Sequence, residues 1–255
     1  MKKTRLLPAL ALAALTALAA LSSAHAAAPD GFKEIFDGKT LAGWKGLDFW
    51  SVKNGAIVGQ TTAEKPTKGN TFLVYQNAEP ANFELRLSFR LTGQNEKSWG
   101  NSGVQYRSKV VDAAAFVIAG YQADLDSPFN YTGMLYEEKG RGILMKSGEK
   151  IRIGETTMVP DTKKKDAKKK QTSVEKLPGA TPAEAIAAAY KLGEWNELVI
   201  TANGNQLRHT VNGVVTADVT DTDTSIEKSG VIALQLHQGQ PMTIQFKNVY
   251  LKTLP

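Results

Sequence analysis

The chain has 255 residues, a formal net charge of +6 and no cysteine. Without cysteine it can form no disulfide and has no thiol nucleophile, so the core must be stable through burial of apolar side chains alone. The positive charge is concentrated in residues 162–176, where seven lysines stand against two acidic residues, and this argues against a nucleic-acid binder, which spreads arginine and lysine over a folded face.

The first elements in chain order are those of a cleavable signal peptide over residues 1–26. Basic residues at positions 2–5 precede an apolar run over 6–21, and Ala24-His25-Ala26 gives the small-x-small pattern that a signal peptidase cleaves. The alternative is a membrane anchor, but the run is short for a helix that spans a bilayer. We therefore expect export to the periplasm or the medium, with a mature chain that begins near Ala27 and has no membrane span.

The rest of the chain has the patterns of β-strands. Apolar and polar residues alternate along 83–91, which is typical of a half-buried strand. Asn54-Gly55 and Asn212-Gly213 each lie between β-type runs and predict hairpin turns, because both turn residues need positive φ. Further strands are expected at 71–75, 103–107, 117–125, 195–201, 231–237 and 243–251. Many short strands with glycine-rich turns predict an all-β fold, a sandwich of antiparallel sheets.

Two segments differ from this strand pattern. Thr181-Pro182 opens a short alanine-rich helix to about Tyr190, with Thr181 as N-cap and Pro182 at the first helical position. The lysine-rich stretch at about 160–180 interrupts the series of strands, and we interpret it as an insertion in a single domain over residues 27–255. Because like charges repel and little there can be buried, we expect a solvated, mobile loop rather than a partner-binding patch.

Three expected strands carry polar pairs two residues apart among apolar neighbours. Since side chains alternate along a strand, each pair shares one face. If the strands belong to one sheet, its polar face collects three glutamines, an arginine, an aspartate and a histidine. Glutamine suits a hydroxyl-rich ligand, whereas the other three can stabilise an oxyanion and move protons. The alternative is an ordinary wet face of an antiparallel sheet. The pairs are Gln105 with Arg107, Gln122 with Asp124, and Gln235 with His237.

The tryptophans and one further histidine have simpler interpretations. Trp44 and Trp50 are expected in the core, and Trp99, in a glycine-rich stretch, at the rim of a site where it can stack on a sugar ring. His209 shares a side with Leu207 and is expected to be hydrogen-bonded and partly buried. The sequence contains no recognised metal-ligand or cofactor motif.

The order and spacing of eight segments resemble the 3-keto-disaccharide hydrolase family, and the resemblance covers about residues 32–254. It implies a concanavalin A-like jelly roll, and an exported bacterial protein that acts on 3-keto-sugars or related glycosides. The sequence departs from the family pattern in its lysine-rich insertion, and in Gln122 where many relatives have glutamate. The segments are 36–44, 50–55, 83–89, 101–107, 120–124, 193–196, 212–213 and 234–237.

The chemistry of a 3-keto-glycoside suggests roles for these residues. The ketone makes the C2 hydrogen acidic, so a base can form an enolate that expels the C1 oxygen, and water then completes hydrolysis. Asp124 or His237 could be the base, and Arg107 the enolate stabiliser, for which a metal ion could substitute. Glu137 or Glu138 could protonate the leaving oxygen, with Arg141 adding positive charge beside them.

Two other functions stay open at this stage. Jelly rolls also serve as sugar-binding modules without catalysis. A conventional glycoside hydrolase needs two carboxylates at a fixed separation, which Asp124 could form with Glu137 or Glu138. In each case the partner is a carbohydrate.

Overall fold

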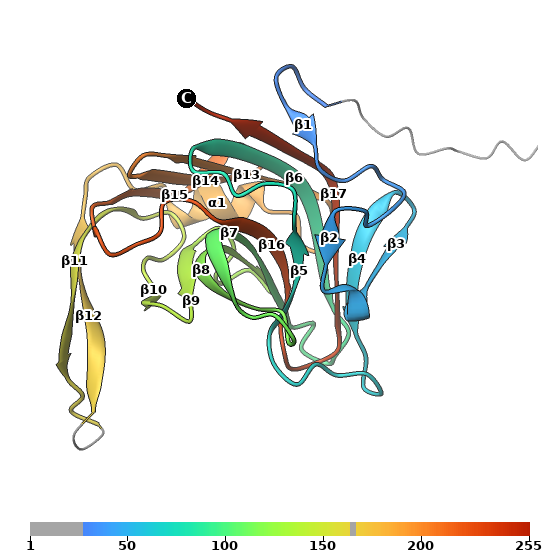
Figure 1. Ribbon diagram of the computed structural model, residues 1–255, viewed down its shortest axis with the longest axis horizontal. Coiled ribbons are helices and arrows are strands. Elements are labelled where there is room, and N and C mark those ends of the chain that lie inside the picture. The colour runs from blue at the N-terminus through green and yellow to red at the C-terminus, as the bar shows by residue number, and fades with distance from the viewer. Residues whose placement is uncertain (1–27, 164–166) are drawn as a thin grey trace, which may run out of the picture.

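The computed structural model describes residues 28–163 and 167–255 (Figure 1). The expected signal peptide and the start at Ala27 lie outside the described residues. Over the described residues the chain forms two stacked β-sheets, of ten and seven strands, in which the pairs are antiparallel except for one parallel pair between β11 and β15. This confirms the expected jelly-roll sandwich of antiparallel sheets.

The ten-stranded sheet forms the upper layer in Figure 1. In spatial order it contains β12 (Lys168–Lys176), β11 (Lys150–Pro160), β15 (Val214–Asp221), β14 (Gln206–Val211), β13 (Asn196–Asn203), β6 (Phe83–Gly93), β17 (Met242–Thr253), β4 (Ala56–Thr61) and β3 (Trp50–Lys53), with β1 (Lys33–Glu34) paired to β17.

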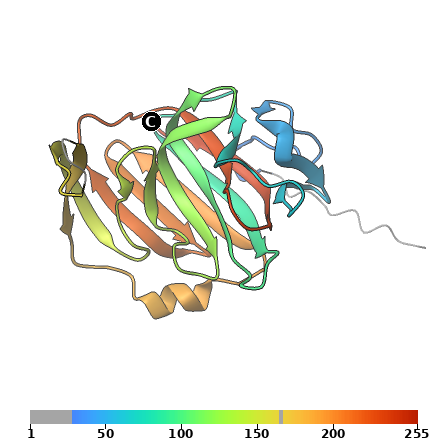
Figure 2. The ribbon, with the colours of Figure 1, turned by 90° about the horizontal axis from the view of Figure 1, so that it is seen from below.

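The seven-stranded sheet forms the lower layer in Figure 1. Figure 2 views the molecule from below, with this sheet toward the viewer. The sheet contains, in spatial order, β10 (Gly142–Ile143), β9 (Leu135–Glu138), β8 (Val117–Ser127), β7 (Gly100–Asp112), β16 (Val231–Leu236), β5 (Thr71–Tyr75) and β2 (Trp44–Lys45). A short 3-10 helix, η1 (Leu47–Phe49), precedes β3.

The core lies between the two sheets and follows the predicted alternation. The apolar residues of β6 at positions 83–91 are fully buried and meet the apolar residues of β7, β8 and β16 from the other sheet. Trp44 and Trp50 are buried in this core, as expected. His209 is completely buried, with its ring nitrogens bonded to the Tyr106 hydroxyl (2.9 Å) and the Gly133 carbonyl (3.1 Å), and burial lowers its pKa to about 4.

The predicted helix exists as α1 (Ala183–Ala189), but its expected N-cap is wrong. Pro182 occupies the capping position and no side chain caps the helix, while the Thr181 N–H donates instead to the Gly148 carbonyl (2.8 Å). Within the described part of the chain, no helix is long and apolar enough to cross a membrane.

The expectation of a lysine-rich loop is also wrong in part. Residues 168–176 form β12, which pairs antiparallel with β11, and the two strands leave the sandwich as a projecting hairpin (Figure 1). We call residues 154–160 and 168–173 the hairpin arm. The side chains of β12 are exposed except for the half-buried Thr172, so the expected solvation is confirmed. Backbone pairing, which the charge pattern does not report, makes this stretch a strand.

Candidate active site

The outer face of the seven-stranded sheet holds a polar pocket of about 200 Å³. Strands β7, β8, β9 and β16 bring together residues that are far apart in the sequence. The expected members Gln122, Asp124, Glu138, Gln235 and His237 all line this pocket. The remaining lining residues are Asn70, Asn101, Tyr131, Met134, Tyr136 and Ile143.

Asp124 lies in the pocket wall, yet it is only 4% exposed. Its carboxylate accepts hydrogen bonds from the Gln122 amide (2.7 Å) and the Asn101 amide (3.3 Å). Burial raises the pKa of Asp124 to about 8, and the nearby negative charges of Asp126 and Glu138 add to the rise. Asp124 is therefore mostly protonated at neutral pH, and can donate a proton.

A chain of hydrogen bonds behind the pocket orients Gln122. The Ser108 hydroxyl donates to Gln105 Oε1 (2.9 Å), and the side-chain amide of Gln105 donates to Gln122 Oε1 (2.8 Å). Gln105 is thus fully buried behind Gln122 rather than exposed to the pocket. A Cβ at Gly103 would lie 2.4 Å from the Gln122 side chain, so only glycine leaves room for Gln122 to cross β7.

Glu138 lies on the same face as Asp124 and is also buried. Its carboxylate accepts hydrogen bonds from the amides of Asn70 (3.4 Å) and Gln235 (3.3 Å). The other amide atom of Gln235, Oε1, is buried without a hydrogen-bond partner among the described residues. Glu138 is therefore held by neutral amides, and it borders open space from which a substrate can approach.

His237 closes the pocket at the end of β16. Its Nδ1 lies 2.5 Å from the Gln238 carbonyl, and only a protonated nitrogen can donate to a carbonyl, so Nε2 is the nitrogen available for proton transfer. The Trp99 ring meets the His237 ring edge-on, with centroids 5.6 Å apart. Trp99 is half-buried and reaches the pocket only through His237, so its expected role at the rim stays a prediction.

Arg107 does not share the face of Gln105, contrary to the expectation from alternation. A bulge follows Tyr106, and Arg107 adopts a left-handed conformation with φ of 46°. Its guanidinium donates to the carbonyls of Ala81 (2.7 Å) and Gly204 (2.8 Å), away from the pocket. A single extra residue in a strand reverses the side-chain order, and nothing in the local residue types signals it.

Glu137 and Arg141 also lie elsewhere, on the inner side of the sheet. Arg141 binds the carboxylates of Glu137 and Asp221, the latter at 2.7 Å, and its side chain is 1% exposed. The Tyr121 hydroxyl donates to Asp221 at 2.5 Å, and burial, followed by the charge of Asp221, raises the pKa of Tyr121 well above its ordinary value. We call Glu137, Arg141, Asp221, Asp223 and Tyr121 the inner ionic cluster.

Some of the residues missed by the sequence analysis had a readable signal. Asn101 precedes Gly103 and Gln105 at intervals of two, and Tyr136 precedes Glu138 in the same way, so alternation applied further along these strands would have found both. Asn70 and Tyr131 come from loops and had none. The carboxylate of Asp126 accepts from the backbone N–H groups of residues 130–132 and so fixes the loop that carries Tyr131.

The pocket is electrostatically unusual for an oxyanion site. Its lining, over the residues that the structure describes, includes two carboxylates and one histidine but no lysine or arginine. In the same described ranges, no three histidine, aspartate or glutamate side chains are grouped as a metal ion requires. The N–H donors available to a negative charge that develops in this pocket are therefore those of its side-chain amides.

The fold and this pocket define the class of protein: a jelly roll with a polar pocket on the outer face of one sheet, suited to a carbohydrate. Residues 31–252 match the family described as 3-keto-alpha-glucoside-1,2-lyase-like domain, and the chain belongs to that family. A search of curated protein sequences found no match.

Solved structures share this fold. A candidate glycosyl hydrolase from Parabacteroides distasonis is 18% identical with a TM-score of 0.53, over 88% of this chain and 94% of that chain. The carbohydrate-binding module CBM66 from Bacillus subtilis is 16% identical with a TM-score of 0.50, over 83% of this chain and 96% of that chain. At these identities the likeness shows the fold alone.

Proposed function

We propose that this protein cleaves 3-keto-glycosides by elimination across C1 and C2, with hydrolysis as the net result once water adds. The observation that carries the proposal is the pair of carboxylates, Asp124 and Glu138, on one face of one pocket in different surroundings. Membership of the 3-keto-alpha-glucoside-1,2-lyase-like family supports this reaction, since a ketone at C3 makes the C2 hydrogen acidic.

The surroundings of the two carboxylates suggest their roles. A buried acid whose pKa is near 8 is suited to give a proton, and Asp124 is therefore assigned to protonate the leaving C1 oxygen. Glu138, held by two neutral amides, is assigned to remove the C2 proton. This reverses the assignment from sequence, which made Asp124 a candidate base, and it replaces Glu137 by Glu138.

The electron flow balances with these residues alone. Glu138 takes the C2 proton and the C–H electrons form the enolate of the C3 ketone. The enolate then forms the C1–C2 double bond and expels the C1 oxygen, which takes the proton from Asp124. Water adds across C1 and C2 in a separate step. With Arg107 outside the pocket, the enolate oxygen is stabilised by amide N–H groups such as that of Asn101.

Isotope exchange tests the elimination directly. The enzyme is incubated in D₂O with a 3-keto-α-glucoside and, as a control, with the unoxidised glucoside. Elimination places deuterium at C2 of the recovered substrate or the hydrolysed product, and leaves the control intact because its C2 hydrogen is not acidic. Cleavage of the ketone without deuterium at C2 contradicts the proposal. If a chelator abolished turnover, a metal ion rather than the amides would stabilise the enolate oxygen.

Two other functions predict different results in the same assay. A conventional hydrolase, for which Asp124 and Glu138 would be the carboxylate pair, cleaves the unoxidised glucoside as well. A sugar-binding module binds both compounds and cleaves neither, and the amide-rich lining of the pocket, with Asn70, Asn101, Gln122 and Gln235, is the observation that favours it.

We also propose that the protein is exported. The support is the signal-peptide pattern of residues 1–26. Expression of the full chain in a bacterial host, followed by fractionation and intact-mass analysis, should give a periplasmic or secreted product that begins near Ala27. A membrane-bound product that retains residues 1–26 would contradict this.

A further inference from the structure

A second, larger cavity adjoins the proposed active site. It has a volume of about 490 Å³, and Glu138, the residue assigned as the base, lines both this cavity and the polar pocket. Its walls come from β7, β8, β9, the turn between β9 and β10, the hairpin arm and the loop between β15 and β16. We call this cavity the side groove.

The side groove is lined by three lysines from separate elements and by Arg107, whose guanidinium donates to backbone carbonyls. Its acidic lining residues are Glu137, which Arg141 neutralises, Glu138 and Glu227. Lys109 comes from β7, Lys139 from the turn after β9, and Lys170 from the hairpin arm. Lys109 lies 3.8 Å from Glu227 with both side chains largely exposed, so this ion pair is weak. Lys139 and Lys170 are exposed, and among the described residues the structure records no ion pair for either.

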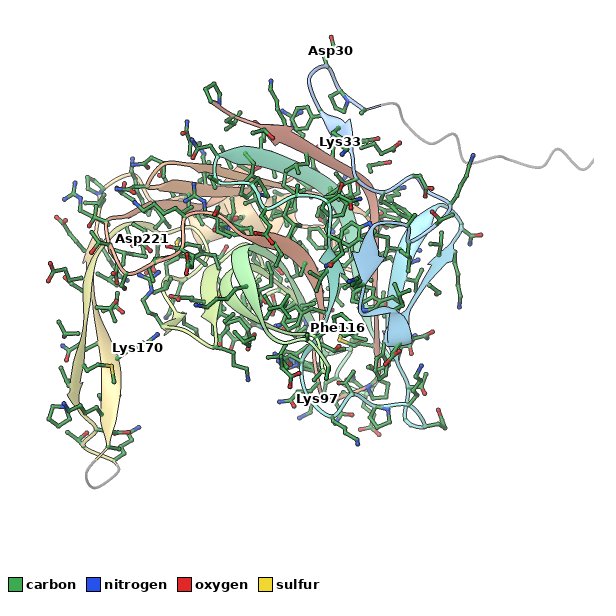
Figure 3. The ribbon with its side chains drawn as sticks, in the orientation of Figure 1. Asp30, Lys33, Lys97, Phe116, Lys170 and Asp221 are labelled. Atoms are coloured by element: carbon green, nitrogen blue, oxygen red, sulfur yellow. The ribbon has the colours of Figure 1, made fainter. Side chains whose placement is uncertain are left out.

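The hairpin arm presents one face to the side groove. Lys170 pairs with Met158 and Lys168 with Pro160 in the antiparallel register, so Lys168 and Lys170 share a face of the arm while Lys169 lies on the other. Figure 1 shows the arm projecting beside β9 and β10, and Figure 3 labels Lys170 about halfway along it. The arm, which is the projecting edge of the ten-stranded sheet, thus places positive charge at one end of the active site.

We propose that the side groove binds an anionic group, a carboxylate or a sulfate, on the leaving part of a 3-keto-glycoside. This rests on the proposed function and names its substrate class: glycosides whose second unit is acidic. The anion would lie near Lys139 and Lys170, while the 3-keto-glucosyl ring occupies the polar pocket on the other side of Glu138. Lysine is suited to this role as a mobile point charge that does not demand one anion geometry.

Matched aglycones test the proposal. The substrates are the 3-keto-α-glucosides of 4-hydroxybenzoate, 4-hydroxybenzenesulfonate and 4-(hydroxymethyl)phenol, which differ in charge more than in size. The wild-type kcat/KM should favour the two anions, and this preference should decline as salt rises because exposed charges are screened. Lys170→Glu should reduce kcat/KM for the anions by about tenfold and leave the neutral substrate within about twofold. The ratio between carboxylate and sulfonate identifies the preferred anion.

Lys169→Glu is the matched control, because it makes the same charge change on the opposite face of the arm. It should leave all three substrates nearly unchanged. Equal losses in Lys169→Glu and Lys170→Glu, or no preference for anions in the wild type, would overturn the proposal. If no 3-keto-glycoside is cleaved, calorimetry with the unoxidised α-glucoside of 4-hydroxybenzoate, which carries its carboxylate on the leaving part, replaces turnover. Weaker binding in Lys170→Glu than in Lys169→Glu supports the groove, and equal binding refutes it.

Discussion

Glu137 and Glu138 are neighbours in the sequence and lie on opposite faces of β9. Glu137 points to the inside of the sandwich, where Arg141 neutralises it within the inner ionic cluster. Glu138 points to the outside, where two amides hold it beside a second carboxylate, Asp124. One residue along a strand therefore separates a charge that belongs to an ion-pair network from a charge that faces open space.

This difference shows how charge is used in the two places. A buried acid with a cationic partner is satisfied, and its removal leaves the partner charge unpaired. Asp124 has no cationic partner, and burial beside other acids raises its pKa, so it can hold a proton for transfer. The comparison predicts that changes on the inner face alter stability and that changes on the outer face alter turnover.

The largest effect is expected for Glu138→Gln. The substitution keeps the shape but removes the base, so turnover of a 3-keto-glycoside should fall by roughly 10²-fold to 10⁴-fold. Glu137→Gln makes the same change one residue away and should keep kcat within about threefold while lowering the melting temperature. If the two variants lost activity equally, the assignment of the base to the outer face would be wrong.

The loss of turnover in Asp124→Asn should depend on the leaving group. With a sugar as leaving group turnover should fall by roughly 10²-fold, whereas a nitrophenol, which needs no proton, should leave at nearly the wild-type rate. In the wild type, turnover of the sugar substrate should decline as pH rises through about 8, since Asp124 then loses the proton that it donates. An equal loss of turnover for both leaving groups would show that Asp124 acts as the base rather than as the acid.

The same substitution has a consequence for stability. The pKa of Asp124 is raised on folding from its ordinary value of 3.8, so its contribution to stability is complete below that value and is lost as pH rises toward 8. The asparagine of the variant does not titrate. The melting temperature of Asp124→Asn relative to wild type should therefore increase between pH 4 and pH 8, as measured by thermal melts. A constant difference would show that Asp124 is not protonated in the folded state.

Arg141→Met tests the inner face through its effect on the stability of the protein, not on turnover. Removal of the guanidinium leaves Glu137 and Asp221 without their cation, which should cost about 3–5 kcal/mol of unfolding free energy in a denaturant titration. Arg152→Met is the control, because Arg152 pairs with Glu175 at 2.7 Å but both side chains are more than half exposed. That variant should lose at most about 1 kcal/mol. Equal losses would mean that burial of the cluster is unimportant.

Among the variants on the outer face, Gln105→Leu should have the smallest effect on turnover. Gln122 then loses its donor and is free to rotate, so turnover should fall roughly threefold to tenfold, the cost of one unsatisfied buried acceptor. The bond from Gln122 lowers the pKa of Asp124, so weakening it should move the alkaline decline of activity to higher pH. Gln206→Leu, which removes an exposed bond to Thr220, is the control and should change neither.

Local patterns were sufficient for most of the fold. Alternation in 83–91 and the Asn-Gly turns depend on neighbouring residues only, and the structure confirms them. The pocket was predictable where strands are regular, so Gln122, Asp124, Gln235 and His237 lie on one face as expected. The prediction that Arg107 shares the face of Gln105 was wrong. The bulge turns Arg107 toward the carbonyls of residues 81 and 204, which are distant in the sequence.

By itself, the sequence determined which residues are apolar on alternate positions, and hence a sandwich with one polar outer face. Only the tertiary structure decided that Glu138 rather than Glu137 reaches the pocket, that Asn70 joins it from a loop, and that the lysine-rich stretch is a strand beside the site. The physical reason is that alternation is a property of the local backbone. Burial, the pKa of Asp124 and the pairing of Arg141 depend instead on which strands lie opposite one another.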